Sequence, residues 1–133
     1  SGAGDVNGDG VDDIIIGAPR AEFSPVTDQG RAYVVFGGVG VGASGELDLS
    51  SLNGSNGFKL NGTAEAGFFA ESVSGAGDVN GDGYDDIIIG SAHRNPGGPN
   101  LAGESYVLFG GPTVGQGFIS LNGLDGSDGF AVA

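Results

Sequence analysis

The sequence contains no cysteine, which excludes disulfide bonds and thiolate metal sites. It has only 4 Lys and Arg residues against 17 Asp and Glu residues, a net charge of −13, so nucleic acids and anionic membranes are poor partners. No apolar run is long enough to cross a bilayer, so we expect no membrane insertion. A signal peptide is also missing, and a secreted protein would have its signal outside this sequence or already removed.

Helical periodicity is missing as well, while glycine is abundant. No stretch sustains a 3.6-residue apolar period, which predicts almost no helix. Glycine accounts for 30 of the 133 residues. Without a regular pattern, such a content would be typical of disorder. Here the glycines recur in a repeat, which indicates turns between short strands.

The chain consists of two copies of one unit, which is the first feature a fold argument must use. Three segments of the first copy return in the same order in the second: residues 1–4, 33–38 and 54–58 as residues 74–77, 106–111 and 126–130. The first two pairs share an offset of 73 residues (74 − 1 and 106 − 33), and the third pair is one residue closer. Variable stretches separate these segments and are expected to be loops.

Each copy is predicted to form one small antiparallel sheet. Four strands are expected in the second copy, at residues 68–74, 86–90, 104–109 and 129–133. Four short strands that turn at glycine-rich loops are typical of a propeller blade. The sequence therefore predicts an all-β fold of two tandem four-stranded antiparallel β-propeller blades, residues 1–62 and 63–133. The first blade is expected to lack its first strand, because the chain starts where that strand should end.

The segment DVNGDGVDD at residues 5–13, repeated as DVNGDGYDD at 78–86, has the composition of a calcium loop. Oxygen-bearing side chains occupy positions 1, 3, 5 and 9, and glycine at position 6 permits a sharp turn. Position 7 can contribute its backbone carbonyl. The predicted ligands are Asp5, Asn7, Asp9, Val11 and Asp13 in the first loop, and Asp78, Asn80, Asp82, Tyr84 and Asp86 in the second. We therefore expect two Ca²⁺ sites, one per repeat.

The residues after each loop distinguish it from an EF-hand. An EF-hand requires a glutamate at position 12 and a flanking helix, but Ile16 and Ile89 occupy that position. Three isoleucines closed by glycine indicate a short buried strand instead. The ligand set therefore ends at position 9. Asp12 and Asp85, at position 8, are expected to point away from the cation and to bond to loop backbone.

These motifs, taken in order, resemble the FG-GAP repeat of integrin α-subunit propellers and their bacterial relatives. The resemblance rests on the calcium loop, Gly17-Ala18-Pro19 and the segment 33–38, and it covers essentially the whole chain. Two departures leave turn details open: Gly90-Ser91-Ala92 replaces Gly-Ala-Pro, and Phe69-Ala70 replaces Phe-Gly. The resemblance implies that calcium is structural on one rim and that partners bind loops on the other face. The variable loops 20–30 and 93–103 are candidates for recognition.

Two blades cannot close a ring, since propellers typically have about four to eight. We therefore expect further blades from a longer protein, or other copies of this chain, as partners. No catalytic constellation is visible, so the function expected is a non-catalytic calcium-binding module for adhesion or protein interaction. Calcium loops of modest affinity suit a secreted or cell-surface protein.

Two other functions stay open at this stage. One is a carbohydrate-binding propeller with a glycan ligand, and the other is an accessory domain of a larger polysaccharide-active enzyme. Four aromatic residues bear on the first alternative: Tyr33, Phe36, Tyr106 and Phe109. We expect them in the core between blades rather than on a sugar-stacking surface.

Overall fold

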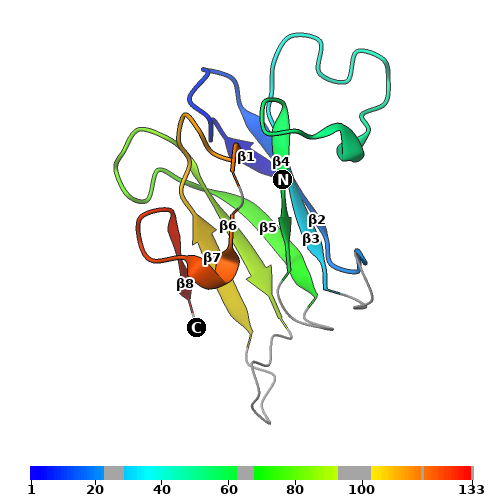
Figure 1. Cartoon of the computed structure of the whole chain (residues 1–133). Helices are drawn as coiled ribbons and strands as arrows, with labels where there is room; N and C mark the ends of the chain where they lie inside the picture. Colours follow the sequence, from blue (N-terminus) through cyan, green and yellow to red (C-terminus); the bar gives the residue numbers. More distant parts are fainter. Residues whose placement is uncertain (23–28, 63–67, 93–102, 118, 133) are drawn as a thin grey trace.

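The protein forms two four-stranded antiparallel sheets that lie side by side (Figure 1). The computed structural model describes five stretches of the chain: residues 1–22, 29–62, 68–92, 103–117 and 119–132. The first sheet contains β1 (Gly2–Gly4), β2 (Asp13–Ala18), β3 (Arg31–Val35) and β4 (Gly57–Asn61). The second contains β5 (Phe69–Gly77), β6 (Asp86–Ser91), β7 (Glu104–Leu108) and β8 (Gly129–Val132). The all-β prediction is confirmed, because the helical elements in these stretches are two short 3₁₀ turns, Leu49–Ser51 (η1) and Leu121–Gly123 (η2).

The two sheets are copies of one design. Each strand pairs with the next one along the chain, so both sheets follow chain order. The isoleucine runs form β2 and β6, the second strand of each sheet, since β-branched side chains pack well on a pleated surface. Ile14 pairs with Val35 in the first sheet, and Ile87 pairs with Leu108 in the second. The sequence repeat is therefore also a repeat of strand register.

The first strand of the first sheet is short but present, which corrects the expectation that this blade lacks it. β1 has three residues, whereas β5 has nine. Its residues correspond to Gly75–Gly77 at the end of β5, so the chain does begin near the end of this strand. Three residues suffice because Ser1 adds two backbone bonds: its amino group donates to the Ile15 carbonyl, and the Ile15 N–H donates to the Ser1 carbonyl, both 2.8 Å.

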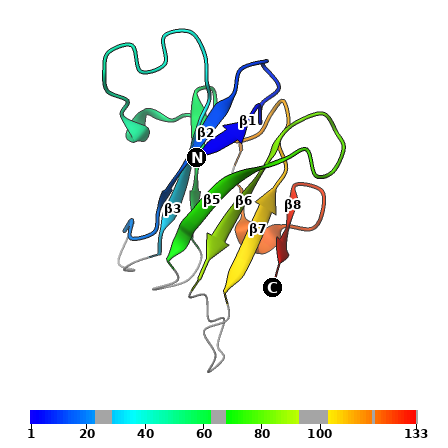
Figure 2. The ribbon, with the colours of Figure 1, turned by 180° about the vertical axis from the view of Figure 1, so that it is seen from behind.

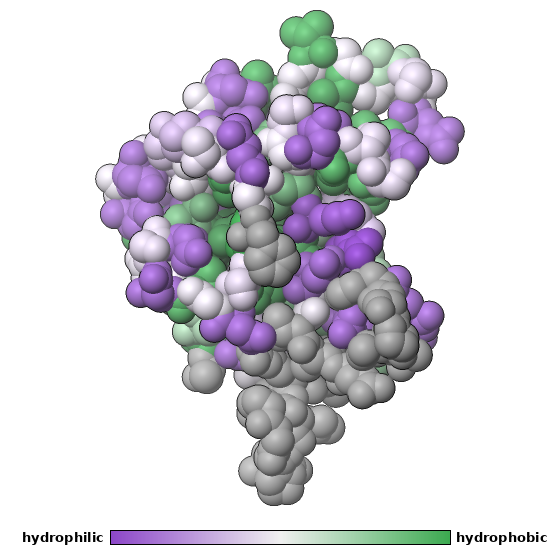
Figure 3. All heavy atoms as spheres, viewed as in Figure 1, coloured by the Kyte–Doolittle hydropathy of each residue, from purple (hydrophilic) through white to green (hydrophobic). Residues whose placement is uncertain are grey.

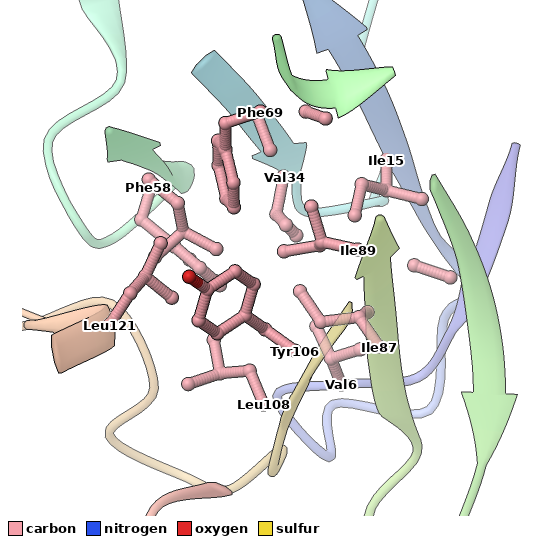
Figure 4. Close-up of a cluster of buried hydrophobic side chains, with 14 of the residues drawn as sticks. Val6, Ile15, Val34, Phe58, Phe69, Ile87, Ile89, Tyr106, Leu108 and Leu121 are labelled. Carbon is pink, nitrogen blue, oxygen red and sulfur yellow. The ribbon is translucent and has the colours of Figure 1, made fainter. Parts of the chain in front are cut away.

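A single hydrophobic cluster joins the two sheets. β5 lies against the first sheet, next to β1 and β2 (Figure 2). Tyr106 lies among the labelled side chains of this cluster, near Val34, Phe58 and Leu121 (Figure 4). Its ring contacts that of Phe69 edge-on, with centroids 5.9 Å apart, and its buried hydroxyl donates to a Glu104 carboxylate oxygen at 2.9 Å.

Equivalent strands of the two sheets bury opposite faces. In β2, Ile15 is buried and Ile14 is 46% exposed, whereas in β6 Ile87 and Ile89 are buried and Ile88 is 36% exposed. Neighbouring residues on a strand point to opposite faces of the sheet. The first blade therefore presents one face to the interface and the second blade presents the other, which is the stacking of successive propeller blades.

This stacking determines which of the four aromatic residues expected in the core are buried. Phe36 and Tyr106 are buried at the interface, as expected. Tyr33 and Phe109 are half-buried, because they lie on the faces turned away from the other blade. Figure 3 shows one side of the molecule, where apolar residues (green) remain visible between polar ones (purple).

The departure from Phe-Gly at Ala70 has a structural consequence. Ala70 is buried and adopts φ 66°, in the left-handed region that L-residues other than glycine rarely occupy. A Cβ on Gly17 of β2 would overlap the Ala70 carbonyl oxygen, so the two blades approach closely at this turn. The turn therefore keeps the backbone shape of a glycine turn, although it carries alanine.

Some expectations fall on residues outside the described stretches. The expected boundary between the units, at residues 62 and 63, borders the undescribed residues 63–67, and most of the loops 20–30 and 93–103 is also outside them. In the described stretches, no helix is long and apolar enough to cross a membrane.

Candidate metal centre

Both expected calcium loops connect the first and second strands of their sheets. Residues 5–13 join β1 to β2, and residues 78–86 join β5 to β6. The two loops lie at the same end of the blades (Figure 1) and are linked by hydrogen bonds. The fold therefore brings the two predicted ligand sets close to each other.

A carboxylate at position 1 organises each loop. Asp5 accepts three backbone N–H bonds, from Gly8 at 2.8 Å, Asp9 at 3.0 Å and Gly10 at 2.8 Å. Asp9 in turn accepts from the Val11 N–H at 2.9 Å and from the Asn7 side-chain amide at 3.1 Å. The oxygen-bearing side chains at positions 1, 3 and 5 are therefore drawn together by the loop itself.

The second loop repeats this frame. Asp78 accepts from the backbone N–H groups of Gly81, Asp82 and Gly83 at 2.7, 3.0 and 2.8 Å. Asp82 accepts from the Tyr84 N–H at 3.0 Å. Position 6 turns the backbone sharply in both copies, with φ 87° at Gly10 and φ 92° at Gly83, where other residues would be strained.

The carboxylate at position 9 has a second task that the sequence did not reveal. Asp13 is 1% exposed and accepts the Val6 N–H at 2.9 Å and the Gly37 N–H at 2.8 Å. Asp86 is 0% exposed and accepts the Val79 and Gly110 N–H groups at 2.8 and 2.9 Å. These residues therefore tie the loop to the end of the third strand. The available signal was the Gly-Gly pair that follows this strand in both copies.

Burial makes a charge on Asp13 costly. Desolvation raises the pKa of the Asp13 carboxyl, the bonds from the Gly37 and Val6 N–H groups act in the opposite direction, and the Asp9 and Asp5 carboxylates raise the pKa further. A cation beside Asp13 would offset this penalty, because it favours the ionised form.

The donor set fits calcium in its chemistry. Each loop offers three carboxylates, one side-chain amide and one backbone carbonyl, all of them the hard oxygen donors that Ca²⁺ prefers. A carboxylate has about four lone-pair positions, so the bonds from loop amides leave acceptor capacity for a cation. In the part of the chain that the structure describes, no three His, Cys, Asp or Glu side chains form a ready-made metal cage. The ligand oxygens would therefore have to move inward to surround the ion.

The two position-8 aspartates differ in their surroundings. The Asp85 carboxylate accepts a bond from the backbone N–H of Asp5, at 2.9 Å, so it contacts loop backbone as expected, but in the other blade. Asp12 is exposed and makes no such bond within the described stretches. The difference follows from position, because within the described stretches only the second blade has another blade on that side.

The fold and its paired loops define a class: tandem β-propeller blades, each with a calcium-type loop between its first two strands. Comparison with known families gives the FG-GAP repeat, which matches residues 1–35 and 69–108, more than half of the chain. The chain belongs to the FG-GAP repeat family.

The curated relatives of this chain include several integrin α subunits. Integrin alpha-4 of Xenopus laevis is 33% identical over 108 residues, covering 81% of this chain and 9% of its own length. Integrin alpha-PS2 of Drosophila melanogaster is 33% identical over 112 residues, covering 81% of this chain and 7% of its own length. Integrin alpha-8 of Mus musculus is 36% identical over 112 residues, with 81% and 9% covered. The chain thus spans less than a tenth of the length of these relatives.

Proposed function

We propose that this chain is a non-catalytic calcium-binding β-propeller module of a secreted or cell-surface protein, acting in adhesion or protein interaction. The observation that carries the proposal is the same hydrogen-bonded frame in two loops, each holding the same set of oxygen side chains. The similarity to integrin α subunits supports the adhesive role. An adjoining catalytic domain in the parent gene would instead make the chain an accessory part of an enzyme.

The residues proposed to hold the cations are those at positions 1, 3, 5, 7 and 9 of each loop: Asp5, Asn7, Asp9, Val11 and Asp13, then Asp78, Asn80, Asp82, Tyr84 and Asp86. When bound, calcium would neutralise carboxylates that otherwise repel one another. Two ions would change the net charge from −13 to −9. Calcium is therefore proposed to stabilise the folded blades, as does any ligand that binds only the native state.

Calcium is expected to raise the melting temperature, and loss of one carboxylate per loop should remove the effect. With a Kd of about 10⁻⁴–10⁻³ M, about 10 mM calcium adds about 1.4–2.7 kcal/mol per site. Replacing Asp9 and Asp82 with alanine together should reduce this gain to near zero, because both are exposed ligands of the loops. Melting is measured by circular dichroism in calcium and in EDTA, with the exposed Glu46→Ala as control. Equal melting of the wild-type protein in both conditions would rule out structural calcium.

The first blade has an outer face equivalent to the inner face of the second. Ile14 and Tyr33 correspond in the repeat to Ile87 and Tyr106, which are buried between the blades. Ile14 is 46% exposed and Tyr33 is half-buried. This face therefore has the residues with which a blade packs against a preceding blade.

The second blade has the complementary outer face. Ile88 and Phe130, 36% and 39% exposed, correspond to Ile15 and Phe58, which are buried at the internal interface. The two outer faces therefore reproduce the two halves of the existing interface. We propose that residues 1–62 and 63–133 are two successive blades, extended in both directions by further blades of a parent protein or by copies of this chain.

Light scattering on a sizing column tests assembly from copies alone. A discrete multimer is expected in calcium, because head-to-tail contacts between the two outer faces can repeat until a ring closes. Ile88→Ser should shift the mass towards the monomer, while Val39→Ser, at a fully exposed loop residue, should leave the mass unchanged. A wild-type monomer at high concentration would assign the missing blades to a parent protein instead.

One observation keeps a carbohydrate-binding function as a second candidate. An open cavity of about 540 Å³ lies between the blades and is lined by apolar and amide side chains, among them Phe58, Asn61, Leu121 and Asn122. Amide groups beside apolar surface can bind sugar hydroxyls. A glycan array without signal at high protein concentration would remove this candidate.

A further inference from the structure

The two calcium loops contact each other directly through Asp85. The backbone N–H of Asp5 donates to the Asp85 carboxylate at 2.9 Å, and the Asp85 N–H donates to the Asp5 carbonyl at 3.2 Å. A third bond follows at the next residue, from the Gly111 N–H to the Val6 carbonyl at 2.8 Å. These residues belong to different blades, so the bonds connect the first loop to the second loop and, through Gly111, to the segment that follows β7.

The two loops are also in close steric contact with each other. A Cβ on Gly4 would overlap the Asp85 carboxylate, and a Cβ on Gly8 would overlap the Tyr84 ring. Within the described residues, a Cβ on the corresponding Gly77 or Gly81 would meet no neighbouring atom. The first loop therefore rests on the second with little freedom to shift independently.

The connected residues are an expected ligand of the first loop and a chain neighbour of two expected ligands of the second. Asp5 is the position-1 ligand of the first loop and organises three of its amides. Asp85 lies between Tyr84 and Asp86, which are positions 7 and 9 of the second loop. When the ligands of one loop move inward around an ion, the bonds between Asp5 and Asp85 therefore shift or fix the corresponding residue of the other loop.

We propose that Asp85 is a positioning residue that couples the two calcium loops, so that calcium in one loop raises the calcium affinity of the other. The inference rests on the proposed calcium function. When either loop closes around an ion, the Asp5–Asp85 bonds restrict the other loop, which then loses less freedom on binding its own ion. The coupling must be reciprocal, because it is a free energy shared by the two sites.

The repeat supplies a matched control for this proposal. Asp12 occupies position 8 of the first loop, as Asp85 does in the second, but it is exposed and bonds to no other blade within the described stretches. Removing the Asp12 carboxylate changes the charge by the same amount without touching the contact. Any effect of general acidity would therefore appear in both variants, and an effect of the contact would appear only at Asp85.

The test is a calcium titration followed by NMR, in which the amides of Gly10 and Gly83 report the first and second loops separately. Asp82→Ala disables the second site, and we expect it to raise the Kd of the first loop about fivefold, within the usual range for coupled sites. In an Asp85→Ala background the same change should leave that Kd within about twofold of its value. Asp12→Ala should keep the fivefold effect, and so should Asp85→Asn, which retains an oxygen acceptor.

The outcomes separate this inference from the proposed function. Should Asp85→Ala fail to fold, the wild-type protein and Asp82→Ala still give the coupling by themselves. If both loops bind calcium but the Kd of the first loop is the same in the wild-type protein and in Asp82→Ala, the coupling is overturned and the calcium function is not. A fivefold effect that survives in Asp85→Ala would assign the coupling to other contacts and overturn the role of Asp85. If neither glycine amide shifts with calcium, the calcium function itself is overturned, and the coupling with it.

Discussion

Replacing Asp86 with alanine is expected to lower the free energy of unfolding by about 3–5 kcal/mol even in EDTA, where no calcium can contribute. Asp86 is completely buried, and its two carboxylate oxygens accept the backbone N–H groups of Val79 and Gly110 at 2.8 and 2.9 Å. Alanine would leave both partly buried donors without their partner, at about 1–3 kcal/mol each. A small cavity would add to this loss.

Asp82 provides the control within the same loop. Its side chain is exposed, so Asp82→Ala in EDTA should change the free energy of unfolding by less than about 1 kcal/mol. Urea denaturation followed by circular dichroism measures both variants. Equal losses for Asp86→Ala and Asp82→Ala in EDTA would show that the position-9 carboxylate has no structural task apart from the metal.

Replacing Tyr106 with alanine is expected to destabilise the protein by about 3–5 kcal/mol, the usual cost of removing a large aromatic side chain from a core. Tyr106 is 1% exposed and lies between the two blades, with its ring against Phe69 and its hydroxyl bonded to Glu104. The change would open a cavity at the interface, so both blades should melt together at a lower temperature.

The repeat again offers a matched control, at Tyr33. This residue occupies the same position in the first blade, but it lies on the outer face and is only half-buried. Tyr33→Ala should therefore cost about 1 kcal/mol or less in dilute, monomeric protein. Similar losses at the two positions would mean that the blades do not pack through the second blade's inner face.

Most of the fold is predictable from the internal repeat. The strands expected at 86–90 and 104–109 are observed as Asp86–Ser91 and Glu104–Leu108. Their ends are predictable because glycine, proline and the loop residues interrupt each apolar run. The expectation that the first blade lacks its first strand is wrong, since three residues give no pattern of their own and depend on pairing with β2.

The buried face of each strand could not be predicted from the sequence. Ile14, Ile15 and Ile16 are identical side chains, so no alternation of polar and apolar residues distinguishes the inner face from the outer one. The neighbouring blade decides, and it covers Ile15 in the first sheet but Ile87 and Ile89 in the second. Such a choice depends on the order of blades rather than on local sequence.

Part of the candidate site was likewise predictable from the sequence, and part was not. The ligand set of each loop is predicted from residue spacing, and it stays a prediction until calcium binding is measured. The bonds from the Gly110 N–H to the Asp86 carboxylate and from the Asp5 N–H to the Asp85 carboxylate could not be anticipated, because they join residues 24 and 80 positions apart. Contacts of this kind follow only from how strands and blades are placed in space.

Calcium stoichiometry tests the central claim most directly. Equilibrium dialysis against calcium at about 0.1–10 mM should give two ions per chain with a Kd of about 10⁻⁴–10⁻³ M. Asp9→Ala and Asp82→Ala should each remove one ion, and together both. A chain that binds no calcium at about 10 mM, or that binds two ions regardless of these changes, would contradict the assignment of the two loops as calcium sites.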